Sequence, residues 1–135
     1  MADYQFITLA REGRLTILTM NRPDVMNAVH APMHEEMGAA LDAFAADPEQ
    51  WVCIITGAGP RAFSAGMGGG FEIALACDLI IAADTAVFAL PEPKVGLAAL
   101  AGGMHRLPRE IGLKRAMSMI LTARRVGAAE GKELG

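Results

Sequence analysis

The sequence predicts an α/β fold, and three observations support this prediction. Segments typical of strands and segments typical of helices alternate along the 135 residues. The run at residues 51–56 is continuously apolar and rich in β-branched residues, which is typical of a strand buried on both faces of a sheet covered by helices. Hydrophobic residues make up 53% of the chain and charged residues 20%, which is enough to build a core. We expect a single domain over residues 1–135.

The first half of the chain is predicted to contain a hairpin and a helix. Residues 6–10 and 15–20 are β-prone, and the turn-like residues 11–14 separate them. Across residues 32–46 the apolar side chains recur at spacings of three and four, which predicts an amphipathic helix. This helix is expected to end at residues 47–48, because a proline disfavours helix at the residue before it.

The second half begins with glycines. A glycine run at residues 68–70 precedes the apolar residues 71–77, which predicts a loop leading into a buried helix. Residues 79–83 and 86–90 are strand candidates. The remaining segments are a loop or short helix at residues 102–107, a helix at 113–121 opened by Pro108, and a helix at 128–134.

Charge and hydropathy exclude several classes of function. A net charge of −3, without a run of Lys or Arg, gives no general attraction to nucleic acid or to an anionic membrane. The N-terminus lacks the basic region and the apolar core of a signal peptide. Asp78 and Asp84 interrupt the longest apolar stretches, well short of the ~20 residues that a membrane span needs. We therefore expect a cytoplasmic protein.

The cysteines and histidines do not predict a metal site. Cys53 and Cys77 lie in apolar runs and are expected to be buried free thiols of a reducing compartment. His30 and His34 are one helical turn apart, but no third ligand accompanies them. We predict neither a metal nor a separate cofactor.

The glycine run and Glu72 are the first candidates for chemistry. Consecutive glycines at a helix start allow backbone N–H groups to approach an oxyanion or a phosphate closely. A flexible turn or a close helix contact explains the same glycines equally well. Glu72, in a mostly apolar stretch, either lies on an exposed helix face or is buried for proton transfer.

Glu92 is the second carboxylate candidate, because Pro91 and Pro93 fix the backbone on both sides of it. A plain surface turn is the alternative, and a single Pro-Glu-Pro favours it. Two carboxylates on separate elements can act as acid and base on one water molecule. The residues alone do not show whether Glu72 and Glu92 meet.

Taken in order, several motifs resemble the crotonase, or enoyl-CoA hydratase/isomerase, superfamily. Each motif is weak alone, but their order makes the resemblance specific, and it covers nearly the whole chain. The motifs are Asn-Arg-Pro through Asn-Ala at residues 21–28, Ile-Ile-Thr-Gly through Ser-Ala-Gly at 54–66, Gly-Gly-Gly-Phe-Glu through Cys-Asp at 68–78, Phe-Ala-Leu-Pro-Glu at 88–92, then Gly96 and Gly102-Gly103.

The resemblance implies an enoyl-CoA hydratase with a crotonase-like ββα spiral core. Gly69 matches a residue whose amide binds the thioester oxygen. Glu72 and Glu92 match the two glutamates that hold and activate water, and their separation of 20 residues agrees with hydratases. Coenzyme A is part of the substrate, and the family forms homotrimers or dimers of trimers. The predicted substrate-binding residues are Met26, Ala28, Ala65 and Gly66 in CoA-contacting loops and Leu100, whose amide can help to position water.

The chain departs from the family pattern in its centre and at its end. In the family a helical loop and another strand follow Ala-Gly and lead to the triple glycine, whereas here Gly66 runs through Met67 into Gly68. Roughly 40 residues are missing, more than loop-length variation explains. The C-terminal helices are also absent. We therefore expect an incomplete form of the fold.

Two explanations of the gap are open: a longer protein of which this sequence is a part, or a genuine deletion. We favour the former, because a true deletion would expose the edge and the apolar surface of the strand at residues 51–56. Three other functions also remain open: an enoyl-CoA isomerase, a carnitinyl-CoA-type dehydratase, and a non-catalytic acyl-CoA-binding or assembly subunit.

Overall fold

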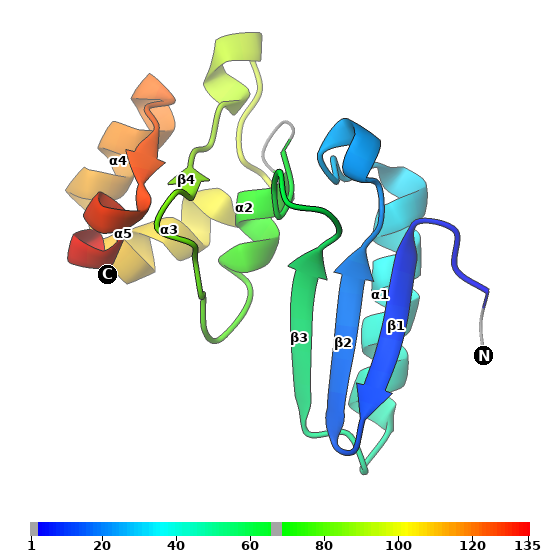
Figure 1. Cartoon of the computed structure of the whole chain (residues 1–135). Helices are drawn as coiled ribbons and strands as arrows, with labels where there is room; N and C mark the ends of the chain where they lie inside the picture. Colours follow the sequence, from blue (N-terminus) through cyan, green and yellow to red (C-terminus); the bar gives the residue numbers. More distant parts are fainter. Residues whose placement is uncertain (1–2, 66–68) are drawn as a thin grey trace. The chain divides into compact units, whose positions relative to one another are not determined.

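The computed structural model describes residues 3–65 and 69–135 (Figure 1). The chain divides into two compact units, residues 1–66 and 67–135, and each is described by itself. The single domain expected over residues 1–135 stays a prediction.

A three-stranded sheet forms the centre of the N-terminal unit. Its strands are β1 (Ile7–Glu12), β2 (Leu15–Met20) and β3 (Val52–Gly57), in the order β1-β2-β3. β1 and β2 are antiparallel, which confirms the predicted hairpin. β1 extends further than the sequence predicted, so that the turn contains only Gly13, at φ 60°, and Arg14.

One helix, α1 (Ala31–Ala46), connects β2 to the parallel strand β3 and covers one face of the sheet (Figure 1). It agrees with the helix predicted from the apolar spacing and ends before Asp47-Pro48. A short 3-10 helix, η1 (Pro23–Val25), precedes it. The buried hydrophobic side chains of this unit come from α1 and from the sheet: Ile7, Leu18, Met20, Met33, Met37 and Ala40.

The prediction that residues 51–56 are buried on both faces is wrong. Val52 and Ile54, which share one face of β3, are 55% and 45% exposed. Within the N-terminal unit α1 covers only the opposite face, and among the described residues β3 pairs with β2 alone. A run of apolar, β-branched residues therefore forms the predicted strand, but not the second layer that would bury it.

Short helices make up most of the C-terminal unit. Its core consists of Leu75, Leu90, Ala99, Leu107, Ile111, Ala116, Met119 and Val126. The elements are α2 (Gly69–Ala74), β4 (Val87–Phe88), η2 (Glu92–Val95), α3 (Gly103–Ile111), α4 (Leu113–Thr122), β5 (Val126–Gly127) and α5 (Ala128–Leu134).

Two strand predictions in this unit need correction. Residues 79–83 form neither strand nor helix, because among the described residues no neighbouring strand pairs with them. Of the predicted strand at residues 86–90 only β4 forms, paired antiparallel with β5. A sequence can favour the extended conformation, but a strand also needs hydrogen-bond partners on a neighbouring segment.

The predicted helical region after residue 102 is divided differently than expected. Pro108 does not open a helix but lies inside α3. The division comes at Gly112, whose φ of 84° favours glycine and ends α3 before α4 begins. The helix predicted at residues 128–134 coincides with α5.

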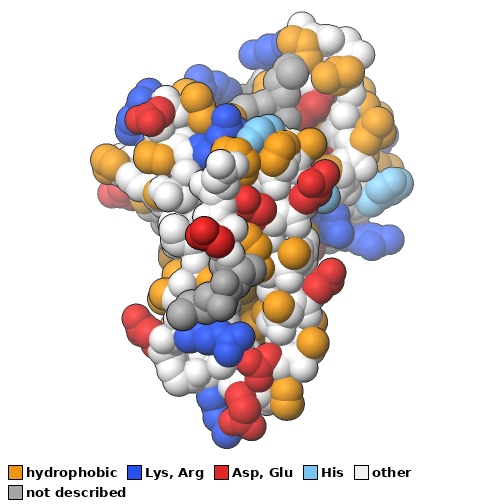
Figure 2. Space-filling model, turned by 90° about the vertical axis from the view of Figure 1, so that its right-hand side faces the viewer, with side chains coloured by type: hydrophobic (Ala, Val, Ile, Leu, Met, Phe, Trp, Pro, Cys, Tyr) orange, Lys and Arg blue, Asp and Glu red, His pale blue; other side chains and the backbone are white. Residues whose placement is uncertain are grey.

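Among the described residues, none of the helices has the length and hydropathy needed to cross a membrane. On the face drawn in Figure 2, positive and negative side chains are interspersed, with hydrophobic side chains between them. This distribution agrees with the small net charge, and that face shows no continuous patch of Lys and Arg side chains.

Candidate active site

Glu72 lies on α2 and is buried, with 5% of the residue exposed. Its Oε1 accepts a hydrogen bond of 2.8 Å from the backbone N–H of Gly103, at the start of α3. Of the two alternatives from the sequence, an exposed helix face or a buried carboxylate, the structure shows the second. The hydrogen bond fixes the direction of the carboxylate.

Gly103 is a site residue that the sequence analysis missed. A Cβ at this position would lie 3.0 Å from Glu72 Oε1 and 3.1 Å from Ala99 Cβ, so the carboxylate approaches the backbone where a side chain would interfere. The signal in the sequence is the pair Gly102-Gly103, which belongs to the family pattern. The bond to Glu72 gives Gly103 its role in the site.

Glu92 begins η2 and is 4% exposed, so the surface turn that Pro-Glu-Pro favoured is wrong. Its backbone carbonyl accepts a hydrogen bond of 3.0 Å from the N–H of Leu97. Neither carboxyl oxygen has a hydrogen-bond partner among the described residues. A buried polar group normally has a partner, so this carboxyl group is suited to hold a small polar molecule.

The other two predicted residues of the C-terminal unit are Gly69 and Leu100. Gly69 is the first residue of α2, which confirms the predicted helix start. Leu100 has an exposed side chain, and its N–H donates to Ala98 O at 2.9 Å. That N–H would have to leave this turn to position a water molecule. The catalytic roles of Gly69, Glu72 and Glu92 stay predictions.

Three of the predicted CoA-contacting residues lie together in the N-terminal unit. The N–H of Ala65 donates to Met26 O at 2.7 Å, and Arg22 Nη1 donates to Ala28 O at 2.6 Å. The segments around Met26 and Ala65 are therefore joined through their backbones. Gly66 lies outside the described residues.

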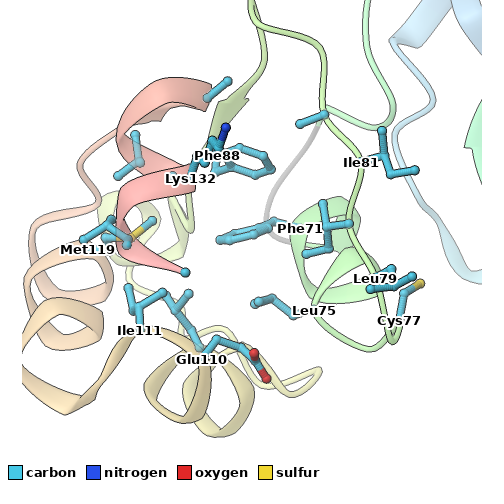
Figure 3. A pocket seen from close by; sticks show the side chains of 18 of the residues that line it. Phe71, Leu75, Cys77, Leu79, Ile81, Phe88, Glu110, Ile111, Met119 and Lys132 are labelled. Atoms are coloured by element: carbon cyan, nitrogen blue, oxygen red, sulfur yellow. The ribbon is translucent and has the colours of Figure 1, made fainter.

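An apolar pocket of about 770 Å³ lies within the C-terminal unit. In Figure 3 the rings of Phe71 and Phe88 project into it, with ring centroids 5.3 Å apart, and Leu79 and Ile81 lie on its other side. None of the predicted site residues lines the pocket. It is thus separate from the carboxyl groups of Glu72 and Glu92.

Cys77 also lines this pocket and donates to Ile73 O at 3.4 Å. Burial raises the pKa of its thiol, and the neighbouring carboxylate of Asp78 raises that pKa further. A raised pKa keeps the thiol neutral, which argues against a nucleophilic role.

Comparison with known proteins identifies the family. The profile described as enoyl-CoA hydratase/isomerase matches residues 10–68 and 66–135. The two matches meet where the sequence analysis placed the missing central segment. The family resemblance inferred from the motifs is therefore confirmed.

Individual relatives agree with this result. A probable enoyl-CoA hydratase, EchA8, of Mycobacterium bovis is 34% identical over 98% of this chain and 67% of its own length. A carnitinyl-CoA dehydratase of Escherichia coli is 35% identical over 94% of this chain and 64% of its own length. A crystal structure of an enoyl-CoA hydratase subunit from Geobacillus kaustophilus matches 99% of this chain and 68% of its own, with 33% identity and a TM-score of 0.94.

The chain thus spans about two thirds of the length of these relatives. The alignment with EchA8 runs over 173 positions although the chain has 135 residues, so at least 38 positions (173 less 135) have no counterpart here. This agrees with the predicted central gap and with an incomplete form of the fold. The chain belongs to the enoyl-CoA hydratase/isomerase family.

Proposed function

We propose that the protein adds water across the 2,3 double bond of a trans-2-enoyl-CoA thioester. The observation that carries the proposal is the pair Glu72 and Glu92, two carboxyl groups more than nine-tenths buried in a chain of this family. Burying a carboxyl group costs free energy unless hydrogen bonds or ion pairs compensate for it, and buried carboxyl groups with few such partners are typical of functional sites. Positioned carboxyl groups are what general acid–base catalysis requires.

In the proposed reaction the two carboxyl groups hold one water molecule. One carboxylate removes a proton from the water as the water oxygen attacks C3 of the substrate. C2 then receives a proton, which by the family resemblance comes from the carboxyl group of Glu92, and the proton taken from the water replaces it, so that both carboxyl groups return to their starting state. The N–H of Gly69 would hold the enolate oxygen together with a second backbone amide, and such donors are typically worth about 3 kcal/mol each.

The different surroundings of the two carboxyl groups support this division of work. Glu72 is held by the N–H of Gly103, so it can orient a water molecule without moving. Glu92 has no protein partner for either carboxyl oxygen among the described residues, so both oxygens can exchange protons with a substrate or a water.

A second candidate is the dehydratase reaction, because a carnitinyl-CoA dehydratase is as similar to this chain as the hydratases are. Incubation with crotonyl-CoA, a 3-enoyl-CoA and carnitinyl-CoA, followed by product analysis, separates the possibilities. We expect 3-hydroxybutyryl-CoA from crotonyl-CoA. A shifted double bond without hydration would instead indicate an isomerase, and turnover of carnitinyl-CoA alone would indicate the dehydratase.

A third candidate is a non-catalytic acyl-CoA-binding subunit, favoured by the missing central positions. Intact mass, measured on the protein isolated from its natural source, distinguishes this case. A mass near 14.2 kDa would support a deleted chain, whereas a much larger mass would support a longer enzyme of which this sequence is a part. Binding of crotonyl-CoA without turnover would establish the non-catalytic function.

A further inference from the structure

We infer that Asn27 is the positioning residue of the CoA-contacting segments, and that Gly57 leaves the space in which the Asn27 amide makes its bonds. This inference rests on the proposed function and on the family resemblance, which predicts that Met26, Ala28 and Ala65 contact coenzyme A. It concerns the N-terminal unit alone, where all five residues lie.

The side chain of Asn27 is fully buried, and its amide oxygen and both its amide N–H groups are hydrogen-bonded. Its Oδ1 accepts a hydrogen bond of 2.9 Å from the N–H of Arg22. Its Nδ2 donates to Ala58 O and to Ala62 O, both at 2.9 Å. A primary amide has two N–H donors, and here each has its own carbonyl partner. One side chain therefore joins the loop after β2 to the loop after β3.

The main chain around Asn27 adds two further bonds between the same loops and one within the loop after β2. Ser64 Oγ donates to Asn27 O at 2.8 Å, and the N–H of Ala65 donates to Met26 O at 2.7 Å. The N–H of Asn27 itself donates to Arg22 O at 2.8 Å. The two predicted CoA-contacting segments are thus joined both by the side chain of Asn27 and by bonds to the main-chain oxygens of Met26 and Asn27.

The backbone conformation shows why these bonds matter. Met26 and Asn27 have φ angles of 53° and 55°, in the left-handed region. Asparagine tolerates this region, but for methionine it is unfavourable, and such a conformation persists only where the surroundings enforce it. The bonds of Asn27 enforce it. They therefore pre-organise the backbone groups that would meet the ligand, which lowers the entropic cost of binding.

Gly57, at the end of β3, gives independent evidence. A Cβ at this position would lie 2.7 Å from Asn27 Nδ2 and 2.9 Å from Ala62 O, and it would be closer still to Phe63 O. Any side chain at residue 57 would therefore displace the amide or the loop bonded to it. Glycine is required here by the carbonyls of Phe63 and Ala62 together with the Asn27 amide, and not by a left-handed φ, because Gly57 is absent from the positive-φ glycines.

Asn27→Asp is the sharpest test, because it keeps the shape and the acceptor but removes both N–H donors. The new carboxylate would face the carbonyls of Ala58 and Ala62. We expect the Kd for coenzyme A, measured by calorimetry, and the KM for crotonyl-CoA to rise at least about tenfold. This is the effect expected when the bonds to Ala58 O and Ala62 O are lost and the CoA-contacting backbone is no longer held in place. The kcat should change less. With crotonyl-N-acetylcysteamine, which lacks the nucleotide, the increase in KM should disappear.

A matched control is Gln50→Ala. The amide of Gln50 also joins two segments, accepting from Thr16 Oγ1 at 2.8 Å and donating to Gly13 O at 3.0 Å, but it lies at the other end of the strands. We expect this variant to lower the melting temperature without changing the Kd for coenzyme A. Gly57→Ala should reproduce the effect of Asn27→Asp, although it leaves residue 27 unchanged.

The results separate the inference from the function on which it rests. If folded Asn27→Asp binds coenzyme A as tightly as the wild type, the positioning role is wrong while the proposed function stands. If the wild type itself neither binds coenzyme A nor hydrates crotonyl-CoA, the proposed function is wrong and the inference with it. If Asn27→Asp does not fold, Ser64→Ala replaces it, because it removes the bond from Ser64 Oγ to Asn27 O. A raised Kd for coenzyme A in this variant would support the positioning role, and an unchanged Kd would contradict it.

Discussion

The carboxylate of Glu72 on α2 caps the start of α3 through its hydrogen bond of 2.8 Å to the N–H of Gly103. No side chain next to α3 in the sequence performs this role, since the preceding residue is Gly102. A negative charge at a helix N-terminus is favourable. One residue therefore both stabilises the fold and presents a fixed carboxylate to the proposed site.

This relationship predicts that Gly103→Ala impairs catalysis. The added Cβ would lie 3.0 Å from Glu72 Oε1, so the carboxylate must move by some tenths of an ångström. Misplacement of a catalytic group is costly, and we expect kcat for hydration of crotonyl-CoA to fall at least about tenfold.

The matched control for Gly103→Ala is Gly131→Ala on α5. There the nearest atom to a new Cβ is Phe88 Cε2 at 3.4 Å, an ordinary contact. This variant should keep the wild-type kcat. A Gly103→Ala protein with unchanged kcat would show that the position of Glu72 does not matter for turnover.

Glu92→Gln should lower kcat strongly and leave affinity for acyl-CoA nearly unchanged. The amide keeps the shape of the side chain but does not exchange protons as a carboxyl group does, and such groups contribute about 10²–10⁴-fold each. The measurement is kcat and KM with crotonyl-CoA, beside Glu133→Gln on the exposed side of α5. Near-normal hydration by folded Glu92→Gln would remove Glu92 from the mechanism.

The elements that the sequence predicts well are those determined by local interactions. The apolar spacing and Asp47-Pro48 determine α1, and turn residues next to β-prone runs determine the hairpin of β1 and β2. The predictions failed where the structure depends on contacts with another segment of the chain. Residues 79–83 have strand-like composition but no paired neighbour, and β3 has one uncovered face.

The same distinction applies to the site. The family motifs located Glu72 and Glu92, but reasoning from residue types alone left the burial of Glu72 open and favoured a surface turn for Glu92. Glu72 is held by Gly103, 31 residues further along the chain. Gly103 and Asn27 were missed for a related reason, because each acts through hydrogen bonds to residues about 31 positions away, and a local pattern does not show such contacts.

The uncovered residues 79–83 predict self-association. Leu79 and Ile81 are 85% and 98% exposed, in a segment without charge between Asp78 and Asp84. Exposed apolar segments without a paired strand promote aggregation. We expect Ile81→Lys to reduce concentration-dependent light scattering without lowering the melting temperature, whereas Ile81→Val should scatter like the wild type. Equal scattering from all three proteins would show that this segment does not drive association.

Gly69→Val tests the oxyanion role separately from the carboxyl groups. Gly69 begins α2, and the first N–H groups of a helix have no partner within the helix. The absence of a Cβ lets a thioester oxygen approach that N–H closely. Valine keeps the N–H but occupies the space of the oxygen, so we expect kcat/KM to fall at least ~10²-fold.

Turnover and thermal melting must be measured on the same Gly69→Val protein, because a loss of activity through unfolding would carry no information about the oxygen site. We expect the melting temperature to change much less than the activity, since Gly69 is only the first residue of α2. Gly131→Ala again serves as the glycine control within a helix. A folded Gly69→Val protein with wild-type activity would mean that the glycines serve helix packing and that another group holds the enolate oxygen.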